Sequence, residues 1–331
     1  MRDEPEGRPA LALVEHVYLV AGPEPSPRVD PREPHALIVG RVRRNDRPAA
    51  WHRTGLPHVN HGRGAPTSYD PAVVLAALPS SISPSKVVTF TDCPRLFQYQ
   101  AIERLEQPPT EATLKGTLVH AALEALFVEP PERRTLQCAT DALRRAADTP
   151  LFEEAIATLA LDDKAFLADA VDLVGRYFDL EDPTTIDAIG IELGLETRLE
   201  GSRGLGDVRL RGIIDRLDRL DDGRLVVVDY KTGRAPGERF ERGSLGGVQT
   251  YALLCESMLG RAPAAVRLLY LREPVAITAV ASEQSIRGQR KRAVAVWSAI
   301  ERACDAEDFR PHVGPLCDYC NFKASCPAFA A

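Results

Sequence analysis

The chain has 331 residues, enough for one large or two modest domains, and its 44% hydrophobic and 27% charged residues are typical of a globular protein. Its net charge of −6 excludes a global basic field, so any contact with nucleic acid has to use local basic patches. No apolar run is long enough for a membrane helix, and Glu15 and His16 interrupt the segment 11–20, which argues against a signal peptide.

Residues 1–80 differ in composition from the rest of the chain. They contain 12 of the 26 prolines and five of the seven histidines, with many arginines and little hydrophobic periodicity. Such a segment buries too little apolar surface to fold well alone, so we expect a poorly ordered leader with at most two short strands, within 11–20 and 36–42. Its scattered histidines are expected to be solvated.

The folded part begins near Ser83 with a series of helices. Ser83 is a typical N-cap residue, and Pro84 after it suits the first position of a helix. A second helix that begins with proline is predicted directly after Cys93. Residues 111–128 then predict a helix that carries His120. A single helical histidine is usually packed or exposed, so this helix alone does not make His120 a metal ligand.

After these helices the pattern changes from helix to strand. Residues 132–180 are rich in alanine and leucine and predict further helices, whereas residues 189–199 alternate apolar and polar side chains as a half-buried strand does.

Two apolar runs, 211–220 and 224–231, flank an Asp-Asp-Gly sequence and predict a hairpin with a three-residue loop. In that register Asp215 lies opposite Asp229, with Cβ atoms about 4.5–5.5 Å apart, and Lys231 projects from the same face as Asp229. Facing carboxylates repel each other unless a divalent cation lies between them, and a lysine beside them suggests phosphodiester chemistry. An amphipathic hairpin with solvated charges fits the same pattern, although charges are costly beside the buried run before Asp229.

Two other aspartates of this hairpin are not site candidates. Asp218 lies an odd number of residues from Asp215 and therefore points to the other face, and Asp222 lies in the turn. Beyond the hairpin the sequence predicts, in order, a loop, a helix that ends at Gly260, two strands and a long helix, over residues 232–243, 244–259, 264–271, 275–280 and 283–304.

The C-terminal region contains a dense group of cysteines. Cys317 and Cys320 are separated by two residues and Cys326 follows six residues later, a spacing typical of a bound metal or cluster. The fourth ligand is open, because His312 completes a local zinc site whereas Cys93 completes a four-cysteine site that joins the first helices to the C-terminus. Seven cysteines in all, an odd number, predict ligation in a reducing compartment and hence a cytoplasmic protein.

Residues 83–328 resemble the RecB/AddB-type branch of the PD-(D/E)XK nucleases in its iron–sulfur form, and the motifs follow the family's order. Residues 116–120 resemble the first motif, 212–218 the Gly-x-x-Asp-Arg-x-Asp motif and 229–233 the Asp-Tyr-Lys-Thr-Gly core. The segment after Cys93, Pro-Arg-x-Phe, together with the three C-terminal cysteines, resembles the family's 4Fe–4S site.

This resemblance implies a restriction-endonuclease-like α/β fold, in which helices flank a mixed central sheet and an iron–sulfur clamp joins the N- and C-terminal parts of the domain. We accordingly divide the chain into a leader, 1–80, and a nuclease domain, 81–331. The nuclease domain includes a helical insert at about 132–180 and a cluster-binding segment at 312–331.

The resemblance also assigns roles to individual residues. The implied ligands of Mg²⁺ or Mn²⁺ are His120, Asp215, Asp229 and the backbone carbonyl of Tyr230, and the implied catalytic lysine is Lys231. The implied ligands of the 4Fe–4S cluster, with zinc as the less favoured occupant, are Cys93, Cys317, Cys320 and Cys326. The candidate contacts to DNA are Arg216, Arg234, Gln249 and Tyr251.

One position departs from the family's pattern. The family places a glutamine four residues before the tyrosine of a Gln-x-x-x-Tyr-Ala motif, but counting back from Tyr251 gives Gly247, and the glutamine here is Gln249. Either Gln249 takes this role from a neighbouring helical position or the DNA contact differs at this point.

As a function, the resemblance implies a metal-dependent DNA exonuclease of repair or recombination that leaves a 5′-phosphate. One alternative is an iron–sulfur subunit that binds DNA ends and has an idle nuclease centre, but the intact ligand set argues against it. Another is a nuclease of the CRISPR-adaptation type, against which the leader and the helical insert argue. The chain contains no Gly-x4-Gly-Lys-Ser/Thr motif, so a helicase partner would be a separate chain.

Overall fold

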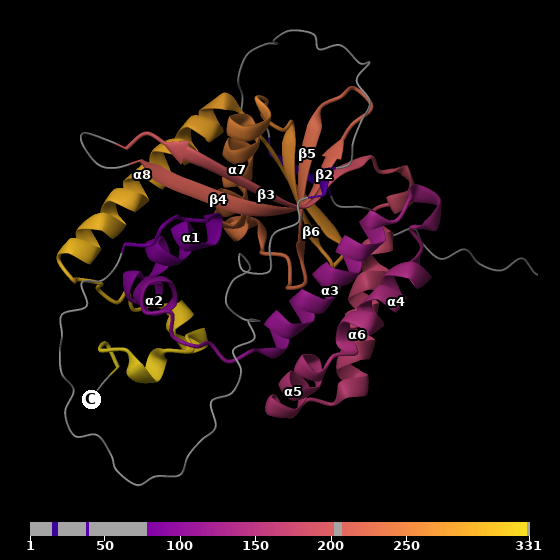
Figure 1. The fold of residues 1–331 in the computed structure, drawn as a ribbon, viewed down its shortest axis with the longest axis horizontal. Coiled ribbons are helices and arrows are strands. Elements are labelled where there is room, and N and C mark those ends of the chain that lie inside the picture. Colours follow the sequence, from indigo (N-terminus) through magenta and orange to yellow (C-terminus); the bar gives the residue numbers. More distant parts are fainter. Residues whose placement is uncertain (1–14, 19–37, 40–77, 202–206, 330–331) are drawn as a thin grey trace, which may run out of the picture.

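A seven-stranded mixed sheet forms the centre of the structure, a computed structural model that describes residues 15–18, 38–39, 78–201 and 207–329 (Figure 1). The strand order is β1-β7-β6-β5-β4-β3-β2. The strands are β1 (Glu15–Tyr18), β2 (Ile38–Val39), β3 (Ala188–Leu199), β4 (Val208–Arg219), β5 (Leu225–Lys231), β6 (Ala265–Tyr270) and β7 (Val275–Val280). β5 and β6 run parallel, as do the edge pairs β1–β7 and β2–β3, and the other pairs are antiparallel.

Helices cover both faces of this sheet, and each face has its own apolar core. One core contains side chains of α1 (Pro84–Asp92), α7 (Glu238–Leu259) and α8 (Glu283–Asp305). The other contains side chains of α3 (Glu111–Val128), α4 (Leu136–Ala147), α5 (Pro150–Thr158) and α6 (Asp163–Leu180). In Figure 1 the two groups lie on opposite sides of the central strands, which confirms the predicted fold class.

Most element boundaries follow from local sequence. The hydroxyl of Ser83 accepts a hydrogen bond from Lys86 N and caps α1, and Thr110 caps α3, whose bounds match the prediction. Gly223 in the hairpin loop and Gly260 after α7 have φ angles of 80° and 69°, the left-handed conformation in which glycine is least strained.

The start of α7 was predicted incorrectly. The sequence predicts a loop as far as residue 243 and a helix from Ser244, but the helix begins at Glu238, after Gly237. Residues 232–243 are rich in glycine and arginine, a composition typical of loops, and this led to the wrong prediction. Burial of later residues of the same helix, Ala252 among them, outweighs the low helix propensity of its glycines.

The leader contributes the two edge strands, which lie within the two segments where the sequence predicts them. Of the rest of the predicted leader, the structure describes only residues 78–80. In the described part of the chain, no helix is both long enough and apolar enough to cross a membrane.

The C-terminal segment folds back onto the first helices, α2 (Pro94–Phe97) and the π-helical turn Gln98–Ile102 (Figure 1). The hydroxyl of Tyr99 donates a hydrogen bond to the carbonyl oxygen of Ser325 at 2.9 Å, and the rings of Tyr99 and Phe322 lie 5.2 Å apart. These contacts bring the two ends of the predicted nuclease domain together.

Candidate active site

The hairpin has the predicted register. Arg216 pairs with Val228 and Arg219 with Leu225, which places Asp215 and Asp229 one position beyond the last ladder pair. At this point the Asp215 carboxylate accepts a hydrogen bond from the backbone N–H of Tyr230 at 2.8 Å. The Asp215 side chain of β4 therefore binds a backbone N–H of β5 beyond the last ladder pair. This hydrogen bond holds Asp215 against the backbone between Asp229 and Lys231.

A second carboxylate lies on the other side of Asp215. The antiparallel pairs Leu193–Ile214 and Ile191–Arg216 place Glu192 of β3 directly opposite Asp215 of β4. Glu192 has a φ of 46°, an uncommon conformation for a residue with a side chain and one that clusters at functional sites. The sequence analysis missed Glu192, because within the alternating strand it occupies an ordinary polar position.

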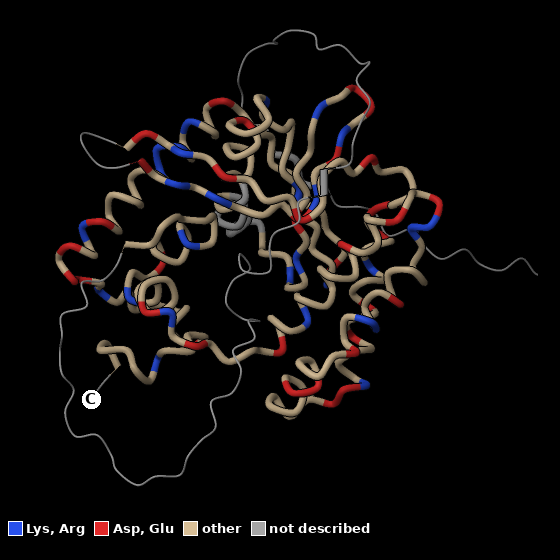
Figure 2. The backbone as a smooth tube through the Cα atoms, in the orientation of Figure 1, with Lys and Arg blue, Asp and Glu red and all other residues tan. Residues whose placement is uncertain are grey.

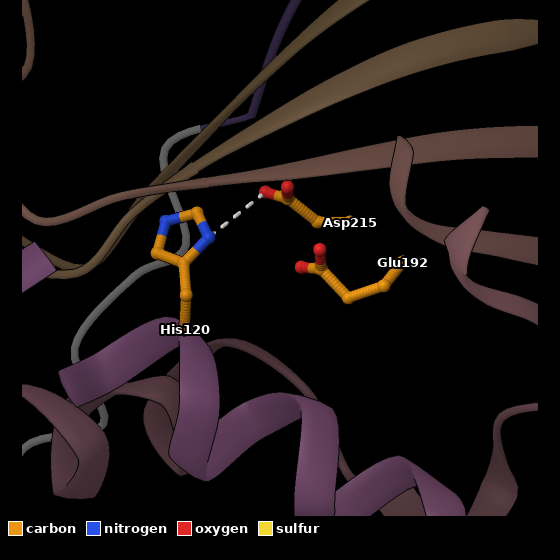
Figure 3. Close-up of side chains that lie close together, drawn as sticks. All are labelled: His120, Glu192 and Asp215. Carbon is orange, nitrogen blue, oxygen red and sulfur yellow. Dashed lines mark ion pairs between the residues drawn. The ribbon is translucent and has the colours of Figure 1, made fainter. Parts of the chain in front are cut away.

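His120 of α3 faces these carboxylates (Figure 3). Its Nδ1 lies 3.5 Å from Oδ2 of Asp215, and its Nε2 lies 3.1 Å from the carbonyl oxygen of Tyr230. Burial lowers the pKa of His120, but its hydrogen bond with Asp215 and the charge of that carboxylate outweigh burial, so the pKa is raised above its usual value. The predicted ligands His120, Asp215 and the Tyr230 carbonyl therefore converge.

Three of these side chains have the spacing of a metal site. One potential ligand atom from each of His120, Glu192 and Asp215 lies within 4.8 Å of the other two. An imidazole nitrogen and two carboxylates are ligands that Mn²⁺ accepts readily, and carboxylate oxygens suit Mg²⁺. The residues present thus fit a divalent cation.

Asp229 and Lys231 form an ion pair beside this group. Asp229 is buried, and burial, followed by the charge of Asp215, raises its pKa to about 6. The Lys231 ammonium, 41% exposed at the side chain, opposes this shift, and its own pKa is raised because the charge of Asp229 outweighs burial. Both side chains project from one face, as predicted, so a partly exposed ammonium lies at one edge of the carboxylate group.

Comparison with known proteins identifies the family. Residues 81–327 match the family model of the PD-(D/E)XK nuclease superfamily. The chain belongs to the PD-(D/E)XK nuclease superfamily.

Several relatives of this nuclease are recognisable. It is 25% identical over 280 residues to the gene 69 protein of Mycobacterium phage D29, covering 75% of this chain and 96% of the phage protein. It is 27% identical over 165 residues to an ATP-dependent helicase/deoxyribonuclease subunit of Streptococcus mutans, covering 47% of this chain but only 14% of that protein. A candidate exonuclease from Eubacterium rectale superposes with a TM-score of 0.46 at 12% identity, covering 78% of this chain and 93% of that one. The family match and the deoxyribonuclease relative support a DNA nuclease.

Arg216 was predicted to contact DNA, and this prediction is wrong. The side chain is fully buried on the far face of the hairpin, where its guanidinium lies over the Phe127 ring at 4.3 Å. It donates hydrogen bonds to Asp218 at 2.8 and 2.9 Å, to Glu181 at 2.7 Å and to the hydroxyl of Tyr230 at 2.7 Å. A guanidinium enclosed in this way cannot reach a phosphate, and its role is to hold Tyr230 in place.

The exclusion of Asp218 and Asp222 from the site is confirmed. Asp218 is buried and bound by Arg216, and Asp222 binds the backbone and side chain of Arg224 in the turn.

The three remaining candidates for DNA contact differ in position. The Tyr251 ring packs against β4, where a Cβ at Gly212 would lie only 2.9 Å from it, so glycine at 212 permits the contact. Burial, followed by the charges of Asp229 and Asp215, raises the pKa of Tyr251. Gln249 accepts a long hydrogen bond of 3.4 Å from Gln289, and Arg234 is 82% exposed at its side chain beyond Lys231.

The four cysteines singled out by the sequence line one cavity between the first helices and the C-terminal segment. The backbone N–H of His312 points at the sulfur of Cys93, and that of Gly314 at the sulfur of Cys317, each at 3.4 Å. The ring of His312 contacts the carbonyl oxygen of Asp92 at 2.9 Å. The fold therefore brings Cys93 to the C-terminal cysteines across more than 200 residues of sequence.

Proposed function

We propose that this nuclease hydrolyses phosphodiester bonds of DNA with the help of Mg²⁺ or Mn²⁺. The observation that carries the proposal is the convergence of His120, Glu192 and Asp215 within 4.8 Å of one another, beside the ion pair of Asp229 and Lys231. Three carboxylates and a raised pKa at Asp229 form a site that favours a divalent cation.

The cation would be held by His120, Glu192, Asp215, Asp229 and the carbonyl of Tyr230, and when bound it supplies Lewis-acid stabilisation of the scissile phosphate. Lys231 lies next to these ligands with a partly exposed ammonium, so it can orient the attacking water and offset charge on the phosphate. The bond between His120 and the Tyr230 carbonyl, together with that between Asp215 and the Tyr230 amide, fixes the ligands before substrate binds.

We further propose exonuclease action in DNA repair or recombination that leaves a 5′-phosphate, in the cytoplasm and with a separate helicase chain as partner. The support is the relative named as a subunit of a helicase/deoxyribonuclease, of which this chain spans 14%. The same proposal includes the division of the chain into a leader, 1–80, and a nuclease domain, 81–331. It also includes DNA contacts by Arg234, Gln249 and Tyr251.

For the four cysteines we propose a 4Fe–4S cluster that fastens the C-terminal segment to the first helices. Four sulfurs around one cavity, two of them approached by backbone N–H groups, fit thiolate ligands. A single zinc ion with bonds of about 2.3 Å holds its sulfurs about 3.8 Å apart, but within residues 78–201 and 207–329 no three of these sulfurs lie within 4.8 Å of one another. Protein purified without oxygen should show a visible absorbance band; a colourless protein would argue for zinc or for no bound group.

Digestion of end-labelled linear DNA and of circular DNA tests the function. The wild-type protein should degrade the linear substrate with Mg²⁺ or Mn²⁺ and not with EDTA, and Asp229→Ala should be inactive. An exonuclease spares the circle, whereas an endonuclease opens it. Metal-independent cleavage, or full activity of Asp229→Ala, would refute the proposal. Binding of DNA ends without cleavage would favour the alternative of a DNA-end-binding subunit with an idle nuclease centre.

A further inference from the structure

Two cations, Lys86 and Arg211, lie beside β4, apart from the active site. Ile82 forms a bridge to Leu210, with its N–H donating to Arg209 O and its carbonyl accepting from Arg211 N, both at 2.9 Å. This bridge holds the first turn of α1, and with it Lys86, next to Arg211. Figure 2 shows basic residues along β4 and on α1.

Glu196 of β3 lies opposite Arg211 in the ladder, but its carboxylate is bound by Arg209, so the group of cations keeps an excess of positive charge. Lys86 is half-buried, and its ammonium donates only to the carbonyl oxygen of Ser81, at 3.3 Å. Arg211 and Arg104 are exposed, and among the described residues neither of them, nor Lys86, forms an ion pair. By contrast Arg219, later on the same strand, is paired with Asp187.

The electrostatics of Lys86 agree with this geometry. Burial lowers its pKa, and the positive charges of Arg211 and Arg104 lower it further. A half-buried cation with like charges around it is unfavourable unless an anion joins the group, and such arrangements occur preferentially at functional sites.

The group lies along the strand that carries the active site. Arg211 and Asp215 are four residues apart, on the same face of β4, and the pairing with β3 continues in one register between them. At about 3.3 Å per residue the two lie roughly 13 Å apart. Since one strand of a duplex rises about 3.4 Å per nucleotide, this separation corresponds to roughly four nucleotides.

We propose that Lys86 and Arg211 bind a backbone phosphate of the DNA substrate within about four nucleotides of the cleaved bond. This rests on the proposed function for its substrate class. The site carries no sequence information, because it recognises phosphate and not bases. It anchors the strand so that the scissile phosphate meets the carboxylates of β4 and β5.

DNA binding in EDTA tests the site without cleavage. Fluorescence anisotropy of a labelled linear DNA, measured at several salt concentrations, should show about tenfold weaker binding by Lys86→Gln/Arg211→Gln. The slope of log K against log salt should fall by about 0.7–0.9 for each phosphate that the variant no longer neutralises. Arg287→Gln is the matched control, since that exposed arginine of α8 is already paired with Glu283 and should bind as wild type does.

Three results separate anchoring from other effects. Because the double variant removes repulsion between like charges, it should unfold at a temperature no lower than wild type; if it does not fold, Arg211→Gln alone serves the test. In cleavage with metal, KM should rise while kcat stays unchanged, and a trinucleotide substrate should be cleaved equally by both proteins. An unchanged salt slope, or an equal loss on the trinucleotide, would overturn the site, whereas a wild type that binds DNA without cleaving it would overturn only the proposed function.

Discussion

Two groups of charged side chains lie on opposite faces of β4 and β5, and they differ in how far their charges are paired within the protein. On the far face the buried Arg216 and the partly exposed Arg267 contact two carboxylates, Glu181 and Asp218, so each of these carboxylates has an arginine partner within the protein. On the catalytic side three carboxylates gather with one lysine and one histidine, and burial raises the pKa of Asp229. The carboxylates of the first group have their partners within the protein, whereas the second group carries an excess of negative charge that the proposed cation would offset.

Tyr230 connects the two groups. Its hydroxyl accepts a hydrogen bond from Arg216, while its amide and carbonyl contact Asp215 and His120 on the other side of the backbone. The balanced group therefore acts as a rigid support for the unbalanced one. Substitutions in the first should change stability, and substitutions in the second should change metal binding and cleavage.

The largest effect is expected for Arg216→Met. Removing the guanidinium leaves Asp218 and Glu181 buried without their partner, which should lower the free energy of unfolding by about 3–5 kcal/mol. Arg219→Met is the matched control on the same strand, because its ion pair with Asp187 is partly exposed and should contribute less than about 1 kcal/mol. Equal losses in urea unfolding of the two variants would contradict the contrast between the groups.

Lys231→Ala should affect only the catalytic side. We expect the cleavage rate to fall by about 10²–10³-fold, the range for loss of one group that stabilises the transition state. Unfolding should remain cooperative but with a lower thermal midpoint than wild type in the absence of metal, since the buried Asp229 loses its partner. Undiminished cleavage of linear DNA would remove Lys231 from the mechanism.

Asp229→Asn should stabilise the protein without metal while abolishing activity. The pKa of Asp229 is raised from 3.8 to about 6, so the folded state binds this proton more tightly than the unfolded state does. Stability from this group is therefore fully present below pH 4 and is lost as the pH rises through 6, by roughly 2–3 kcal/mol in total. Urea unfolding in EDTA at pH 4.5 and pH 7.5 should show this loss in wild type and not in the variant, and identical pH dependence would refute the assignment.

The smallest effect is expected for Tyr230→Phe. The variant loses one hydrogen bond to a charged group, about 1.5 kcal/mol, because Arg216 keeps its carboxylate partners. Since Tyr230 also positions His120 and Asp215, metal affinity measured by calorimetry should fall by about tenfold, the effect typical of a group that orients metal ligands. Unchanged affinity would show that the Tyr230 backbone is held without its side chain.

Much of this molecule is determined by local sequence. The hairpin register, the left-handed glycines at 223 and 260, and the helix of residues 111–128 follow from turn chemistry, caps and periodicity within short segments. Alternation along β4 also excluded Asp218 correctly. Applied to Arg216, which is adjacent to Asp215, the same alternation would have predicted burial on the far face.

Only the tertiary structure decided which distant residues join these segments. Glu192 becomes a site residue because β3 pairs with β4 in a register that no local pattern of residues 189–199 specifies. Arg216 is enclosed because α3 and α6 bring Phe127 and Glu181 over it, and Cys93 meets the C-terminal cysteines because the chain end folds onto α2. Local propensity acts over a few residues, whereas burial and charge pairing depend on contacts that form only when the sheet and its helices are assembled.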